Sequence, residues 1–270
     1  MRINGKVFLV TGAGGGIGSE IALALLSKGA SVAAIDLSEE GLTLLQEKVG
    51  KNPKNISIHT LNISDREAVA KLPEAIIKSH GTIDAVINNA GIVQPFVTVN
   101  DLDYAAIERV MNVNFYGTLY MTKAFLPYLL KRPEAYILNV SSMGGFLPVP
   151  GQSVYGASKA AVKLFTEGLY GELLDSNVHV SVVFPGATNT KITENSGVKT
   201  PSMPSTNGEQ QSFPMLSAGK AAEIIVRGIE KNKPQIFTGS DSNMMNKLYR
   251  LNPIFATKLI TKKMQSLLGA

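Results

Sequence analysis

The alternation of short apolar runs with longer amphipathic stretches constrains the fold of this 270-residue chain more than any other feature. The short runs are apolar throughout, as in strands of a parallel sheet that is covered on both faces. Strands are therefore expected at 6–11, 31–36, 56–61, 83–88, 135–140 and 179–184. Helices are expected between or after them, at about 16–28, 39–49, 65–79, 101–130 and 153–174. This pattern predicts an α/β fold, a single-domain, doubly wound (Rossmann-type) parallel sheet with helices on both faces.

Two segments interrupt this rhythm. Residues at about 190–217 are rich in Thr, Ser, Pro, Asn and Gly and are too long for an ordinary connection. They form either a disordered loop or a substrate lid, and the lid is favoured because open α/β folds bind ligands at the carboxyl ends of strands. Residues 241–270 form a C-terminal helical extension, which leaves 1–240 as one domain.

The charge of the chain is concentrated in that extension. The whole chain carries a net charge of +5, and residues 240–270 hold five basic residues and one acidic residue, a net charge of +4. A nearly neutral body without alternating basic and aromatic residues does not predict nucleic-acid binding. The chain has no cysteine, which excludes disulfides and suits a reducing, cytoplasmic location. Its three histidines are far apart in the sequence, so no metal site is predicted.

A glycine-rich turn, TGAGGGIG, follows the first expected strand at residues 11–18. It departs from the G-x-G-x-x-G fingerprint because Ile17 stands where that pattern needs a glycine. Its spacing is instead T-G-x-x-x-G-x-G, at Gly12, Gly16 and Gly18. Glycines allow backbone amides and a helix N-terminus to approach a pyrophosphate closely. Tight turns between strands and helices also use glycine, so the position after the first strand is what makes this turn informative.

Asp36 ends the second expected strand and indicates which nucleotide the chain binds. A carboxylate at this place accepts hydrogen bonds from the ribose hydroxyls of an adenosine and repels a 2′-phosphate. Leu37 and Ser38 are uncharged, and residues 13–15 supply no cation for a 2′-phosphate. We therefore expect NAD in preference to NADP, against the alternative that Asp36 only caps a loop.

Tyr155 and Lys159 are four residues apart in an expected helix, so their side chains share one face. An ammonium group beside a phenol favours the phenolate and lowers the pKa of the tyrosine towards the range of a general base. Such a pair arises often by chance in a chain with 8 tyrosines. It becomes informative only in the company of further motif residues, several of them polar.

Those further residues stand at the ends of other expected strands or on the helix that follows. They are, in chain order, Asn88, Asn89, Ala90, Gly91, Asn114, Ser141, Ser142, Pro185, Gly186 and Thr190. Asn114 lies inside the long expected helix, where an asparagine is unfavourable without a polar role. Because the carboxyl ends of parallel strands meet at one edge of the sheet, all of these groups are expected to converge there.

In this order and spacing, residues 5–190 resemble the short-chain dehydrogenase/reductase (SDR) family. The motifs that carry the resemblance are T-G-x-x-x-G-x-G, N-N-A-G, the second asparagine of N-V-N, S-S, Y-x-x-x-K and P-G. The resemblance implies an NAD-dependent oxidoreductase that interconverts an alcohol and its carbonyl, with 1–240 as the NAD-binding catalytic domain. It also implies a homodimer or a homotetramer.

The resemblance assigns a role to each of four residues. Tyr155 is the acid/base, and Lys159 lowers the pKa of Tyr155 and binds the nicotinamide ribose. Ser142 positions the substrate oxygen and stabilises its developing negative charge. Asn114 holds a water that links Lys159 to solvent.

Three further positions follow from the resemblance. Thr190 contacts the nicotinamide carboxamide, and Ile192 begins the lid. Asn62 stands where the family commonly has an acidic residue beside the adenine, and its carbonyl can accept from the adenine amino group. The complete expected cofactor site comprises Gly12, Gly14, Gly15, Gly16, Ile17, Gly18, Asp36, Leu37, Asn62, Ile63, Asn89, Ala90, Gly91, Tyr155, Lys159, Pro185, Gly186, Thr188 and Thr190.

The residues expected near the reacting atoms are mostly apolar and include no arginine that would bind a carboxylate or phosphate. They include Met143, Gly144, Gln152 and Phe184, with Met203 and Met215 from the lid. This composition favours a lipophilic secondary alcohol or ketone as substrate. The edge of an ordinary core has a similar composition.

The C-terminal extension predicts a basic amphipathic helix, with Asn252 as its N-cap and Pro253 at its first position. Its apolar and basic residues are Phe255, Leu259, Ile260, Met264, Leu267 and Leu268, with Lys258, Lys262 and Lys263. Such a helix can cover the substrate pocket, pack on another subunit or lie peripherally on an anionic membrane. Packing is the commoner use.

Two other functions compete with the alcohol dehydrogenase. One is an NADPH-dependent carbonyl or 3-oxoacyl-thioester reductase, against which Asp36 argues. The other is a non-catalytic nucleotide-sensing protein on the same fold. Such proteins generally lack the tyrosine or the lysine, and this chain has both Tyr155 and Lys159.

Overall fold

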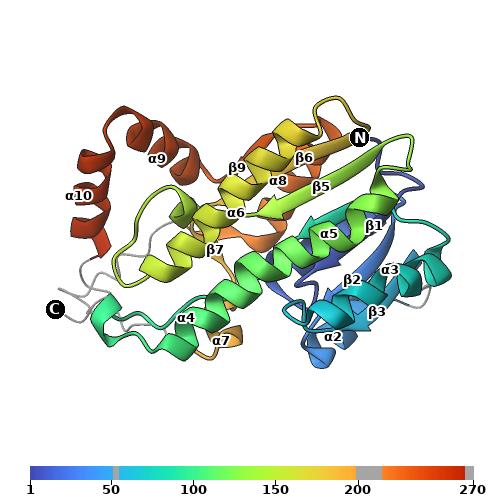
Figure 1. The fold of residues 1–270 in the computed structure, drawn as a ribbon, viewed down its shortest axis with the longest axis horizontal. Coiled ribbons are helices and arrows are strands. Elements are labelled where there is room, and N and C mark those ends of the chain that lie inside the picture. The colour runs from blue at the N-terminus through green and yellow to red at the C-terminus, as the bar shows by residue number, and fades with distance from the viewer. Residues whose placement is uncertain (51–54, 199–214, 265–270) are drawn as a thin grey trace.

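The computed structural model describes residues 1–50, 55–198 and 215–264. In these residues the main sheet has seven parallel strands in the order β3-β2-β1-β4-β5-β6-β9 (Figure 1). The strands are β1 (Val7–Thr11), β2 (Ser31–Asp36), β3 (Ile56–Thr60), β4 (Ala85–Asn88), β5 (Ala135–Val140), β6 (Val178–Pro185) and β9 (Gln235–Thr238). The strand order reverses between β1 and β4, and a crevice opens at the carboxyl ends of strands at such a point.

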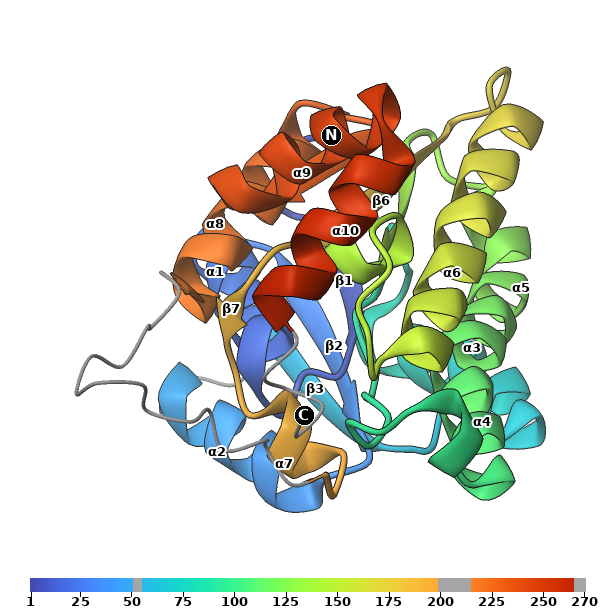
Figure 2. The same ribbon diagram turned by 90° about the vertical axis from the view of Figure 1, so that its left-hand side faces the viewer.

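Helices cover both faces of this sheet, as Figure 2 shows. One face carries α1 (Gly16–Ser27), α2 (Glu39–Val49) and α8 (Ala218–Glu230), whose apolar side chains form one buried cluster with the strands. The other face carries α3 (Arg66–His80), α5 (Thr118–Leu129) and α6 (Ser153–Glu172), which form a second cluster. The predicted α/β class and doubly wound parallel sheet are therefore confirmed.

The six strands expected from the sequence agree with the structure to within two residues at each end. The seventh strand, β9, and the helix before it, α8, were not predicted. β9 has only four residues, and only Ile236 and Phe237 among them are hydrophobic, so the strand is too short to be recognised by its apolar pattern. It extends the sheet by pairing with β6.

The long helix expected at 101–130 is divided into three parts. A 3-10 turn, η2 (Val99–Asp101), precedes α4 (Tyr104–Met111), and a π-helical turn, η3 (Asn112–Gly117), joins α4 to α5. A π-helical turn widens the backbone spiral by one residue and is frequent at functional sites. Hydrophobic periodicity does not distinguish such a turn from the α-helix on either side of it.

The expected lid is described only at its two ends. β7 (Thr188–Asn189) pairs with β8 (Leu216–Ser217), and α7 (Ile192–Asn195) follows β7. The two strands bring residues 187–189 and 216–217 together, so the two ends of the expected lid meet beside the sheet edge. Met203 and the rest of 199–214 lie outside the described residues.

The C-terminal extension consists of α9 (Ser240–Leu251) and α10 (Pro253–Met264). Their inner side chains form a third cluster with the loop after β5, in which Leu147, Met245, Ala256 and Ile260 are buried. The extension therefore packs on the segment that follows Ser142. Leu267 and Leu268 lie outside the described residues. Among the residues that the structure describes, no helix is long and apolar enough to cross a membrane.

Candidate active site

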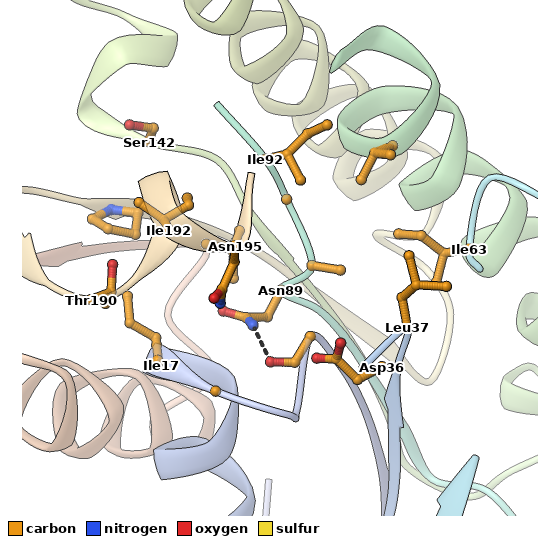
Figure 3. Close-up of a pocket in the computed structure, with 18 of the residues that line it drawn as sticks. Ile17, Asp36, Leu37, Ile63, Asn89, Ile92, Ser142, Thr190, Ile192 and Asn195 are labelled. Carbon is orange, nitrogen blue, oxygen red and sulfur yellow. Dashed lines mark hydrogen bonds between the residues drawn. The ribbon is translucent and has the colours of Figure 1, made fainter. Parts of the chain in front are cut away.

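A cavity of about 430 Å³ opens at the carboxyl ends of β1, β2, β4, β5 and β6 (Figure 3). Most of the expected cofactor residues line it. They are Gly12, Gly15, Gly16, Ile17, Asp36, Leu37, Asn62, Ile63, Asn89, Ala90, Gly91, Tyr155, Lys159, Pro185, Gly186, Thr188 and Thr190. Gly14 and Gly18 are not among the residues that line it, and Ser142 joins Tyr155 and Lys159 on the cavity wall. One edge of the sheet thus assembles residues that are up to 178 positions apart in the sequence.

The glycine-rich turn forms one wall of this cavity. Gly12 and Gly16 have φ angles of +68° and +53°, which favour glycine. A Cβ atom at Gly12 would lie 2.9 Å from the Cα of Ala90, and one at Gly18 would clash with the carbonyl of Gly12, so the turn and α1 pack closely on the loop after β4. No side chain caps the N-terminus of α1, whose first residues line the cavity. This cradle of backbone amides fits a pyrophosphate.

Asp36 stands at the end of β2 with both carboxylate oxygens hydrogen-bonded to backbone. Its Oδ2 accepts from the amide of Gly14 at 2.8 Å and its Oδ1 from the amide of Ser38 at 2.9 Å. Each oxygen keeps a lone pair for a ribose hydroxyl. The contact with Gly14 was not expected, and it means that Asp36 also fixes the glycine-rich turn.

Asn62 lines the cavity, as expected, but its side-chain oxygen is engaged. Oδ1 accepts from the amide of Ser64 at 3.0 Å and from its hydroxyl at 2.7 Å. The segments next to Asp36 supply no cation for a 2′-phosphate, in agreement with the sequence. The cavity nevertheless contains two cations that the sequence did not indicate, Arg109 on α4 and Lys191 before α7.

Lys159 on α6 is buried, and its ammonium points at the end of β5. Its Nζ donates to the carbonyl of Val140 at 3.0 Å, and burial lowers the pKa of Lys159 to about 8. A Cβ atom at Gly91 would lie 2.8 Å from this Nζ and 3.2 Å from Oδ1 of Asn114. Gly91 therefore leaves the space in which Lys159 and Asn114 approach each other.

Burial raises the pKa of Tyr155, and a hydrogen bond with Ser142 opposes this rise. The expected lowering by Lys159 is not found in this geometry, because its ammonium bonds the Val140 carbonyl and desolvation of the phenol prevails. Ser142 also accepts from the amide of Gly144 at 3.0 Å, which fixes its hydroxyl at the start of a short 3-10 turn. The structure thus brings Tyr155, Ser142 and Lys159 together on one wall.

Asn114 is fully buried in the π-helical turn. Its Oδ1 accepts from the amide of Ile92, and its Nδ2 donates to the carbonyl of Ile92 at 2.9 Å and to the hydroxyl of Ser158 at 2.9 Å. The polar role that an asparagine inside a helix requires is therefore to join the loop after β4 to α6. Whether Asn114 also holds a water stays a prediction.

Gln94, which the sequence places among the residues near the reacting atoms, has a second role that the sequence did not indicate. It is fully buried after β4, and its Oε1 accepts from the amides of Val154 at 2.8 Å and Tyr155 at 2.9 Å. Its Nε2 donates to the carbonyl of Gly151 at 3.0 Å. Gln94 thus satisfies the exposed amides at the start of α6, the helix that carries Tyr155 and Lys159. The only sign of this capping role in the sequence is a polar residue shortly after the N-N-A-G motif.

The four residues expected to contact substrate do not line this cavity. Met143 packs against the C-terminal extension, and Gly144 lies beside the ring of Tyr155, since a Cβ atom added at Gly144 would be 3.5 Å from Cε1 of that ring. Gln152 is buried and donates to the carbonyl of Gln94 at 2.9 Å. Phe184 is buried in an aromatic cluster with Phe146 and Phe237. Their contact with substrate stays a prediction.

The first turn of the expected lid lies over the cofactor cavity. Thr190, Ile192 and Asn195 line the cavity, and Figure 3 shows them on the side opposite Ile63. Ser196, at the end of α7, accepts from the amide of Val93 at 3.0 Å and is buried. This bond ties the start of the lid to the loop after β4.

Comparisons with known proteins agree with this site. A family model described as short chain dehydrogenase matches residues 6–200. A Mycobacterium tuberculosis protein named as an oxidoreductase, SadH, is 35% identical over 251 residues, which cover 92% of this chain and 91% of that protein. The 3-oxoacyl-[acyl-carrier-protein] reductase FabG of Thermotoga maritima is 38% identical, over 72% of this chain and 78% of that protein. A short chain dehydrogenase structure from Burkholderia cenocepacia in complex with NADP has a TM-score of 0.79 and 26% identity, over 98% of this chain and 99% of that one.

Proposed function

The chain belongs to the short-chain dehydrogenase/reductase family, and on this premise we propose that it uses NAD to interconvert a lipophilic secondary alcohol and its ketone. Family membership itself makes the chain an oxidoreductase with an NAD(P)-binding fold. The substrate class and the preference for NAD are the proposed part.

One observation carries the proposal. Tyr155 and Ser142 lie on the wall of the same cavity that holds Lys159 and the glycine-rich turn, and the Ser142 side chain opposes the rise in the pKa of Tyr155 that burial causes. A hydroxyl-binding pair beside a pyrophosphate cradle suits proton removal from an alcohol that is held next to a dinucleotide.

The residues of the chain then act as follows. Ser142 donates a hydrogen bond to the substrate oxygen, and Tyr155 in its phenolate form takes the hydroxyl proton. The positive charge of Lys159 favours the phenolate once its ammonium turns from the Val140 carbonyl towards the phenol. NAD held by the glycine-rich turn and Asp36 would supply the acceptor for the hydride of the carbinol carbon, whose C–O bond would become a carbonyl. In the reverse direction Tyr155 returns the proton.

The preference for NAD is proposed from Asp36. Its carboxylate is fixed by two backbone amides at the end of β2 and is therefore oriented before any nucleotide binds. An oriented carboxylate accepts from ribose hydroxyls and repels a 2′-phosphate. Leu37, the next residue, is 69% exposed and uncharged.

A second candidate is a 3-oxoacyl-thioester reductase that uses NADPH. Two findings favour it: the 38% identity with the reductase FabG of Thermotoga maritima and the cations Arg109 and Lys191 in the cavity. The two candidates differ in cofactor and in substrate, so one set of assays separates them.

The test compares the chain with its Y155F variant in assays of NAD reduction by a series of lipophilic secondary alcohols. We expect turnover to fall by about 10²–10⁴-fold, since that is the usual contribution of an acid/base. NADH binding, measured by calorimetry, should stay within twofold. The matched control is Y170F, because Tyr170 lies on the same helix but is 42% exposed.

Two results would contradict the proposal. Turnover of Y155F above a tenth of the parent rate would remove Tyr155 as the base. Faster reduction of 3-oxoacyl thioesters with NADPH than oxidation of any alcohol with NAD would favour the second candidate.

A further inference from the structure

The C-terminal extension has an outer surface that its packing leaves uncovered. The inner side chains of α10, Ala256 and Ile260, are buried against Leu147 and Met245. The helix therefore already covers the loop after Ser142 with one face. The residues on its opposite face are exposed, so their side chains do not contribute to this packing.

The exposed apolar residues gather where α9 ends and α10 begins. Leu251 is 85% exposed, Ile254 is 67% exposed and Phe255 is 53% exposed. Asn252 fixes this corner, because its side-chain oxygen accepts from the amide of Phe255 at 2.9 Å, and the expected N-cap is thereby confirmed. Figure 2 shows α10 on the outside of the molecule with α9 next to it.

Cations accompany these apolar side chains on both helices. Lys247 and Arg250 are exposed in the last two turns of α9, and Lys258 and Lys262 continue from Ile254 at intervals of four residues, on one face of α10. The acidic residue in α9 and α10, Asp241, accepts from the amide of Ala187 at 2.9 Å at the opposite end of α9. We call Lys247, Arg250, Leu251, Ile254, Phe255 and Lys258 the corner surface.

We propose that the corner surface docks on the anionic face of a lipid bilayer. Leu251, Ile254 and Phe255 enter the boundary between headgroups and acyl chains, and the surrounding cations contact anionic headgroups. This combination of exposed apolar groups with basic residues on a helix is the physical basis of interfacial binding.

The charges argue against a second copy of the chain as the occupant. In a symmetric contact the same surface is present on both partners, so the cations of one corner surface would face those of the other. The excess of positive charge is instead complementary to an anionic surface. The proposal does not depend on the proposed function, although docking here places the loop after Ser142 close to the bilayer.

The test is co-sedimentation of the full chain with vesicles of phosphatidylcholine alone and of phosphatidylcholine with phosphatidylglycerol. We expect binding to the anionic vesicles only, and loss of that binding at high salt, because salt screens the headgroup charge. The I254S/K258E variant should bind at least about tenfold more weakly, since it removes an inserted side chain and reverses one charge.

The matched control is L44S/K48E on α2. Leu44 and Lys48 have the same spacing of four residues, and Leu44 is 51% exposed, so the substitutions are equivalent in chemistry and differ only in place. The control should bind like the parent chain. Circular dichroism spectra and urea unfolding curves like those of the parent chain show that both variants fold.

Three outcomes would overturn the proposal. The parent chain fails to sediment with anionic vesicles, or I254S/K258E binds as strongly as the parent. In the third, I254S/K258E lowers the oligomeric mass in light scattering, which would identify a second copy as the occupant.

Discussion

The side-chain oxygen of Gln94 accepts hydrogen bonds from the backbone amides of Val154 and Tyr155, the latter at 2.9 Å. A residue after β4 thus caps the helix of the proposed base. The second of these hydrogen bonds fixes the backbone of Tyr155 relative to the loop after β4, because its donor is the amide of Tyr155 itself. We therefore expect Gln94 to act as a positioning residue.

Replacing Gln94 by methionine should lower turnover by about tenfold or more, since the first turn of α6 loses its cap and Tyr155 is no longer held in place. Two partly buried amides would lose their partner, and an uncompensated loss costs up to about 1–3 kcal/mol for each buried amide. Q94E should retain the cap but place a negative charge near the phenol, so the pKa in its pH–rate profile should rise. Steady-state kinetics across pH measures both effects.

The control for this pair is Q46M, a change at an exposed position of α2. A purely structural role for Gln94 would lower stability in Q94M without changing the pH–rate profile of Q94E. That combination would count against positioning.

Replacing Asp36 by asparagine should shift cofactor preference towards NADP. The variant retains a side-chain oxygen for the Gly14 or Ser38 amide but loses the charge that repels a 2′-phosphate. Loss of a hydrogen bond to a charged group costs about 1.5–3 kcal/mol, so NAD binding should weaken by about 10–100-fold. Calorimetric titration with NADH and NADPH provides the ratio, and an unchanged ratio would leave Asp36 with only its role in the turn.

The residues that the sequence placed well share one property. The glycine-rich turn, Asp36, Asn89 and Ser142 each lie at or just after the end of a strand. The carboxyl ends of parallel strands meet at one edge of the sheet however the helices are arranged. Strand order and local motif therefore suffice to bring these residues to one cavity. Family resemblance added the roles, which geometry alone does not provide.

The features that the sequence missed depend on contacts between distant segments. Gln94 is recognisable as a cap only when α6 is placed against the loop after β4. Asn114, in the π-helical turn, bonds to Ile92 and Ser158, which are 22 and 44 residues away in the sequence. The direction of the Lys159 ammonium towards Val140 is likewise a property of packing, so the pKa of Tyr155 did not follow from the spacing of the pair.

Replacing Lys159 by methionine should abolish turnover and increase stability at neutral pH. Burial lowers the pKa of Lys159 from 10.5 to about 8, a difference equivalent to about 3 kcal/mol. The lost bond to Val140 offsets part of this, so we expect a gain of about 1–2 kcal/mol at pH 7. The unfolded chain binds the Lys159 proton more tightly than the folded chain does. The free energy of unfolding of the parent chain therefore increases as the pH rises from about 8 to 10.5, and the advantage of K159M disappears.

Urea unfolding at pH 7 and at pH 10 measures this difference. K163M is the matched control, since Lys163 lies one turn further along α6 with its side chain 28% exposed and bonded to Glu167. It should show no gain at either pH. Equal stability of K159M and the parent chain at pH 7 would contradict the expected cost of burying this ammonium.

Because two histidines are partly buried at the edge of the sheet, we expect the folded chain to lose stability in mild acid. The hydroxyl of Ser57 lies 2.8 Å from Nε2 of His59 and 2.7 Å from Nε2 of His80. Burial lowers the pKa of both rings, and the neighbouring His80 lowers that of His59 further. Their ordinary pKa is 6.5, so below that pH the unfolded chain binds more protons than the folded one, and the free energy of unfolding falls as pH falls.

The H80N variant should flatten this dependence. Asparagine retains a polar partner for Ser57 without titrating, and it removes the charge that disfavours protonation of His59. Urea unfolding at pH 7.5 and pH 5.5 should show a smaller loss in H80N than in the parent chain. S79N is the control, because Ser79 is an exposed residue next to His80 on α3 and its substitution removes no titrating group. If H80N and the parent chain lost the same free energy of unfolding between pH 7.5 and pH 5.5, the acid sensitivity would have another origin. Of the residues Ser57, His59 and His80, only the two histidines titrate in this range.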